Sequence, residues 1–72
     1  MSEYIRVIEG RRNQIGMTIR SLARQVNMDD DILGKTLHGK RKMTASELIM
    51  LSSVLGLTLA DYQDSGHTAN QQ

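Results

Sequence analysis

The stretch that decides the fold is residues 16–39, GMTIRSLARQVNMDDDILGKTLHG. Its pattern predicts a short helix, a tight corner and a second short helix. Asn27 lies at the corner, and asparagine is the best residue other than glycine for a left-handed backbone. Ala23 precedes the corner, and its small methyl side chain lets the second helix cross closely over the first. The apolar residues expected to fix the angle between the helices are Leu22, Val26, Met28 and Leu33.

The first half of the chain carries clear start and stop signals for helices. Thr18 and Asp29 are helix caps, because their side-chain oxygens can accept a hydrogen bond from the first turn. Gly16 and Gly39 end the segments that precede them. Gly10 weakens the first helix by roughly 1 kcal/mol relative to alanine. Helices are therefore expected over about residues 3–14, 19–25 and 30–38.

The second half opens on a capping box, in which Thr44 and Glu47 satisfy each other's backbone donors. It predicts a helix that continues to about residue 55 and ends at Gly56. Leu48, Leu51 and Leu55 suffice for one core stripe on this helix. Its other apolar residues have two interpretations, a wide core face, which is favoured, or a subunit interface. They are Ile49, Met50 and Val54.

Thr58 and Asp61 form a second capping box, which predicts a short helix near Tyr62. From residue 64 onward the sequence is polar and has no periodicity. One domain over residues 1–63 is therefore expected, followed by a disordered tail over residues 64–72.

Composition narrows the class of protein. Seventy-two residues suffice for one domain. The chain has no cysteine, which excludes disulfides and thiolate metal sites and fits a reducing, cytoplasmic location. The apolar run Leu48–Leu51 is too short to span a membrane, and Met1–Tyr4 does not begin a signal peptide. With no proline and helical periodicity in most segments, the predicted fold class is all-α.

Charge is distributed unevenly along the chain. All nine Lys and Arg residues lie in residues 1–42, together with five of the eight acids, whereas residues 43–72 carry three acids. The basic half coincides with the predicted helix pair, and a polyanion would prefer it. The alternative is that these charges form an ordinary solvated surface.

These features resemble the helix-turn-helix family of phage repressors and Cro proteins, the XRE-like family. The resemblance covers about residues 5–62 and implies a compact five-helix bundle of the lambda-repressor-like type. It further implies a sequence-specific DNA-binding regulator, a repressor that works as a homodimer. Helices two and three would form the DNA-reading unit, in which helix three of each monomer reads one half-site in the major groove. The two half-sites would lie roughly 34 Å apart. The matching residues are Arg12, Gly16, Thr18, Leu22, Ala23, Val26, Met28, Leu33, Gly39, Lys40, Leu51, Leu55, Gly56, Leu57, Thr58 and Asp61.

Three single positions, in addition to an acidic run, depart from the family pattern. Ile19 stands where the family usually has a glutamine that touches phosphate. Leu37 replaces a glutamate that many members pair with the arginine at position 12. Because a buried unpaired guanidinium is costly, Arg12 is expected to turn to solvent or to reach a backbone carbonyl. Thr36 stands at a normally apolar position, where it is tolerable if its methyl group packs inward.

The largest departure is the run Asp29-Asp30-Asp31 at the start of the recognition helix. These carboxylates suit the positive end of the helix dipole but oppose a phosphate backbone. In the family, the positions of Asp30, Asp31 and Lys35 face base edges. An aspartate can accept a hydrogen bond from cytosine N4, so an acidic reader is one interpretation. The favoured alternative is that the acids only cap the helix and repel the wrong DNA.

The resemblance suggests further contacts, each with a simpler alternative. Lys35 contacts guanine or pairs with Asp31, four residues earlier. Gly34 admits the DNA backbone or is a tolerated weak point in the helix. The remaining candidates contact phosphate or are solvated surface groups, with His38 the weaker of them. They are Thr18, Arg20, His38, Lys40, Arg41 and Lys42.

The sequence carries no motif of an enzyme, so no catalytic residue, cofactor or small-molecule ligand is expected. It has no cysteine nucleophile, Gly-x-Ser-x-Gly elbow or His-Glu-x-x-His motif. A calcium loop from Asp29 fails, because Leu33 and Lys40 occupy ligand positions. The other function left open is a protein-interaction module on the same fold, such as an antitoxin or anti-repressor.

Overall fold

The computed structural model describes residues 3–63, and within them the chain is helical, with no β-strand. The helices are α1 (Glu3–Gln14), α2 (Ile19–Gln25), α3 (Asp30–Leu37) and α4 (Ala45–Leu55), and residues 59–63 form a further helical segment. The all-α prediction and the predicted helix positions are confirmed, except that α3 ends at Leu37 with His38 as its cap. The prediction of a disordered tail at 64–72 falls outside the described residues.

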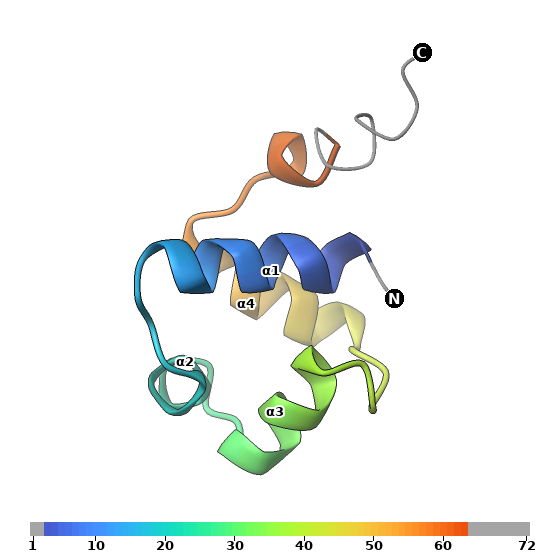
Figure 1. Ribbon diagram of the computed structural model, residues 1–72. Coiled ribbons are helices and arrows are strands. Elements are labelled where there is room, and N and C mark those ends of the chain that lie inside the picture. The colour runs from blue at the N-terminus through green and yellow to red at the C-terminus, as the bar shows by residue number, and fades with distance from the viewer. Residues whose placement is uncertain (1–2, 64–72) are drawn as a thin grey trace.

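The core lies where α1 and α4 pack together above the α2–α3 pair (Figure 1). α2 also packs on α4, so three interfaces meet in one apolar cluster. A Cα radius of gyration of 12.0 Å is that of a compact domain of this size. The apolar side chains with no exposed surface are Ile8, Leu22, Leu33 and Leu51.

Each of the four helices ends in the same hydrogen-bonding motif. A residue with positive φ follows the helix, and the next N–H bonds to a carbonyl oxygen five residues back. At three ends this residue is a glycine, and after α2 it is Asn27 with φ 60°. The closing bonds are Met17 to Arg12 at 3.0 Å, and Met28 to Ala23, Lys40 to Lys35 and Leu57 to Ser52 at 2.8 Å each. The chain therefore turns sharply at each helix end.

The guanidinium group of Arg12, near the end of α1, has two hydrogen-bonding partners close to it in sequence. Its Nη1 donates to the carbonyl oxygen of Met17 at 2.7 Å, which confirms the predicted backbone contact. Its Nε and Nη2 also donate to the two carboxylate oxygens of Glu9, at 2.7 and 2.9 Å, and the hydrogen bonds to Glu9 raise the pKa of Arg12. Glu9, one turn earlier on α1, thus supplies the carboxylate that is absent at Leu37.

The apolar surface of α4 divides into two parts. Leu48 and Val54 are half-buried and pack against the core, as a wide core face requires. Ile49 and Met50 instead remain 68% and 39% exposed. The core thus accounts for one part of this surface, and the proposed subunit interface at the other part stays a prediction.

The left-handed turn at Asn27 allows a prediction about the free energy of unfolding. Alanine pays a penalty of about 1 kcal/mol in the left-handed region, whereas glycine pays none. Asn27→Ala should therefore lower the free energy of unfolding in urea by about 1 kcal/mol. The matched variant Asn27→Gly should stay within about 0.5 kcal/mol of wild type, and equal losses in both variants would contradict this account of the turn.

Candidate nucleic-acid interface

The α2–α3 pair is fixed at both helix starts and at the corner between them. The Thr18 hydroxyl accepts a hydrogen bond from Ser21 N at 3.0 Å, and the Asp29 carboxylate accepts one from Asp31 N at 2.8 Å. Both predicted caps are thereby confirmed. Ala23 is 1% exposed and belongs to the core cluster, and α2 and α3 pack against each other. The pair is a rigid unit whose outer side carries no part of the core.

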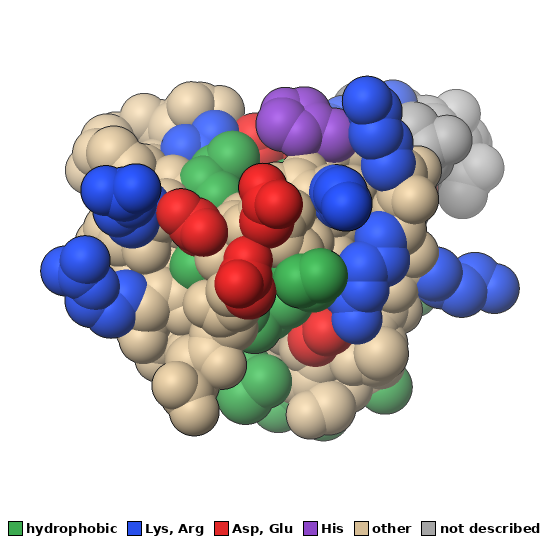
Figure 2. Space-filling view, turned by 90° about the horizontal axis from the view of Figure 1, so that it is seen from below, with side chains coloured by type: hydrophobic (Ala, Val, Ile, Leu, Met, Phe, Trp, Pro, Cys, Tyr) green, Lys and Arg blue, Asp and Glu red, His purple; other side chains and the backbone are tan. Residues whose placement is uncertain are grey.

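The outer face of this pair carries a mixed charge pattern. Figure 2 shows acidic side chains in the middle of the face that α2 and α3 form, with Lys and Arg side chains on either side. The exposed acids of these elements are Asp29, Asp30 and Asp31. The exposed cations of α2, α3 and the loop after α3 are Arg20, Arg24, Lys35, Lys40 and Lys42.

Asp30 lies beside Arg20 across the corner of the pair. Arg20 Nε and Asp30 Oδ2 are 3.5 Å apart, and the two side chains are 78% and 50% exposed. An ion pair this exposed contributes little to stability and breaks readily. Capping uses the carboxylate of Asp29, whereas the exposed side chains of Asp30 and Asp31 remain accessible to a partner.

Lys35 and Gly34 lie in the middle of α3. Lys35 is exposed, and no ion pair within the described residues joins it to Asp31, so the predicted i,i+4 alternative is not formed. A Cβ atom added at Gly34 would have no neighbour within 4 Å. Packing inside the protein therefore does not require glycine here, and the helix surface at Gly34 is open.

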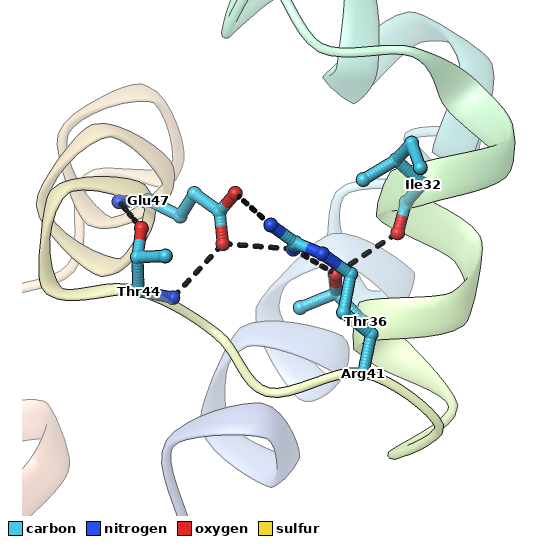
Figure 3. Close-up of polar contacts among 5 residues, drawn as sticks. All are labelled: Ile32, Thr36, Arg41, Thr44 and Glu47. Carbon is cyan, nitrogen blue, oxygen red and sulfur yellow. Dashed lines mark hydrogen bonds and ion pairs between the residues drawn. The ribbon is translucent and has the colours of Figure 1, made fainter.

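The basic residues at the end of α3 and in the loop after it differ in orientation. Three of them are exposed, as a phosphate contact requires: His38, Lys40 and Lys42. Arg41 turns inward, where its Nη1 donates to the Thr36 hydroxyl at 2.8 Å and its guanidinium binds both carboxylate oxygens of Glu47 (Figure 3). Two of the three guanidinium nitrogens of Arg41, which is predicted to contact phosphate, thus already bind partners within the protein, and the side chain remains 32% exposed.

Thr36 is completely buried, and its hydroxyl is fully used. It donates to the carbonyl oxygen of Ile32 at 2.9 Å and accepts from Arg41. These two hydrogen bonds explain how a threonine is accommodated among the buried residues. The Thr44–Glu47 capping box was predictable from the sequence, but Arg41 as the second partner of Glu47 was not.

Arg11 is a further structural arginine that the sequence pattern did not indicate. Its Nη1 donates to the carbonyl oxygen of Leu55 at 2.8 Å, at the end of α4. Its Nη2 lies 3.7 Å from Asp61 Oδ1, and hydrogen bonds from Thr58 lower the pKa of Asp61. Thr58 N–H and the Thr58 hydroxyl both donate to this carboxylate, which is one half of the predicted capping box. The other half is not formed, because Asp61 N–H bonds to the Thr58 carbonyl oxygen at 3.0 Å instead of to its hydroxyl.

In comparisons with known proteins, no family model, no curated protein and no solved structure matches the chain. None of the helices in residues 3–63 has the length and apolar character needed to cross a bilayer. In the same residues no cluster of His, Asp or Glu side chains is arranged to hold a metal ion.

The Arg41–Glu47 pair predicts an acid-sensitive component of stability. Hydrogen bonds from Arg41, and further bonds from Thr44, lower the pKa of Glu47. A lowered pKa in the folded state stabilises the protein at neutral pH, and this contribution is lost as the pH falls below about 4.3, the ordinary glutamate value. Glu47→Gln should therefore unfold more readily than wild type at pH 7 and approach it near pH 3, as urea titrations would measure.

A Glu47→Gln protein that loses as much stability as wild type between neutral and acid pH would contradict the assignment.

Proposed function

We propose that this protein is a sequence-specific DNA-binding transcriptional regulator, most simply a repressor, of the phage repressor and Cro helix-turn-helix class. The observation that carries the proposal is the rigid α2–α3 pair, in which α3 buries Leu33 and Leu37 and exposes its opposite side. A helix held in this way has the shape that enters a DNA major groove. The five helical segments agree with the lambda-repressor-like type, which remains part of the proposal.

Each exposed group has a role in the proposed complex. Asp30, Asp31 and Lys35 face base edges, where a carboxylate accepts from cytosine N4 and an ammonium group donates to guanine. Gly34 lets the phosphate backbone or a base approach the helix surface. The groups assigned to phosphate contacts are Thr18, Arg20, His38, Lys40 and Lys42.

The proposed active species is a homodimer. Two-fold symmetry would present two α3 helices to half-sites about 34 Å apart. The exposed side chains of Ile49 and Met50 on α4 support an interface outside the α2–α3 face.

A protein-interaction module is the second candidate. The three exposed carboxylates at the start of α3 favour it, because they repel phosphate and would attract a basic protein partner. The salt dependence of DNA binding separates the two functions.

DNA binding should weaken steeply with salt. If Arg20, Lys40 and Lys42 of each copy engage phosphates, the slope of log K against log salt is roughly −5 for the dimer. Lys40→Ala combined with Lys42→Ala should reduce the slope to roughly −2. Fluorescence anisotropy with a labelled duplex, measured across a salt series, gives both slopes.

Arg6→Ala is the matched control, since it removes an exposed cation of α1 outside the proposed interface. It should keep the wild-type slope. Absence of binding at low salt, or binding that is insensitive to salt, would refute the proposal and favour a protein partner.

Two helical glycines provide a second test. Gly10 and Gly34 lie inside α1 and α3, and an added Cβ meets no atom within 4 Å at either. Each change to alanine should raise the free energy of unfolding by about 1 kcal/mol. Gly34→Ala should nevertheless weaken DNA binding while Gly10→Ala does not. Equal binding by both stabilised variants would remove Gly34 from the interface.

A further inference from the structure

The loop between α3 and α4 alternates between outward and inward side chains. Lys40 and Lys42 are exposed, whereas Arg41 and Met43 are half-buried, and Met43 packs against the core cluster. Exposure therefore alternates along this loop, and the inward placement of Arg41 and Met43 leaves the two lysines directed outward. The orientation of the lysines thus depends on what holds Arg41.

Arg41 is held at the centre of a continuous chain of hydrogen bonds (Figure 3). On one side, the Thr36 hydroxyl accepts from Arg41 and donates to the Ile32 carbonyl in α3. On the other, the Glu47 carboxylate binds Arg41 at 3.0 and 2.8 Å and accepts from Thr44 N at 2.9 Å. Arg41 therefore connects the main chain of α3 to the N-terminal cap of α4.

The geometry of this link fits arginine and no other cation. The guanidinium group presents two parallel N–H donors to Glu47 and still reaches Thr36 with Nη1. Lysine carries the same charge but has no planar fork. The Glu47 side chain is 13% exposed, so it relies on this partner more than on water.

We propose that Arg41 is a positioning residue of the DNA-contacting loop, which orders Lys40 and Lys42 toward phosphate and makes no phosphate contact itself. The inference rests on the proposed DNA-binding function. The three residues of the basic run 40–42 thereby have different roles: Lys40 and Lys42 contact phosphate, and Arg41 holds the loop in place.

Glu47→Gln separates the two possible roles of Arg41 by the sign of its effect. If Arg41 positions the loop through Glu47, loss of the carboxylate loosens the loop and weakens binding. If Arg41 contacts phosphate, loss of the competing carboxylate releases it and strengthens binding. Glutamine retains the capping box with Thr44, so α4 keeps its start.

The experiment measures binding of a labelled DNA duplex by fluorescence anisotropy for wild type, Glu47→Gln, Arg41→Lys and Arg41→Ala over a salt series. We expect Glu47→Gln and Arg41→Lys to bind about 10-fold more weakly, because re-ordering one loop residue costs about that much in an equilibrium constant. Arg41→Ala should keep the wild-type salt slope. Glu3→Gln controls for the removal of one negative charge on α1.

Three results would overturn the inference while leaving DNA binding established. They are tighter binding by Glu47→Gln than by the Glu3→Gln control, wild-type affinity of Arg41→Lys, or a slope reduced by about 1.8 in the Arg41→Ala dimer. Hydrogen exchange gives a readout without DNA: the amides of residues 38–44 should exchange faster in Glu47→Gln and Arg41→Lys, and unchanged exchange would also refute the link. Absence of wild-type binding would instead refute the proposed function itself.

Discussion

The left-handed turn at Asn27, closed by the hydrogen bond from Met28 N to the Ala23 carbonyl oxygen, is the constraint on which the rest of the structure depends. It reverses the chain directly after α2, so that α3 begins beside the helix it must pack on. The methyl group of Ala23 permits a close approach, and Leu33 and Leu37 then enter the common core. One side of α3 is fixed by burial, and the other side is exposed as a consequence.

Features set by neighbouring residues were predictable from the sequence. The caps at Thr18, Asp29 and Thr44 use contacts within three residues, and their hydrogen bonds form as the residue types indicate. The helix ends at Gly39 and Gly56 follow equally local rules, because positive φ there favours glycine. The core residues of the α2–α3 pair were also predictable, because their apolar side chains recur at the spacing of a helix.

The contacts made by arginine side chains were less predictable, because a long flexible side chain chooses its partner from the tertiary fold. Arg11 caps the end of α4, which lies 44 residues away in sequence. Arg41 pairs with Glu47 across a loop whose conformation no periodicity describes. The Glu9–Arg12 pair has the i,i+3 spacing at which helical side chains meet, whereas the family pattern places the partner of Arg12 at position 37.

The acidic start of α3 gives the proposed interface an unusual balance. Carboxylates lower the general affinity for phosphate, while a cation-rich loop on the same face raises it. In the function that we propose, such opposition favours discrimination, since Asp30 or Asp31 is well placed only where a base offers a donor. In that case, the affinity for DNA depends on how firmly the loop at 38–44 is held as much as on its positive charge.

Mapping of backbone amide chemical shifts during titration with a duplex, selected for binding from random sequences, tests the central claim most directly. The account predicts that the perturbed amides gather at the start of α2, along α3 and in the loop at 38–44. Perturbations confined to α4 and residues 59–63, or distributed evenly over the protein, would contradict it.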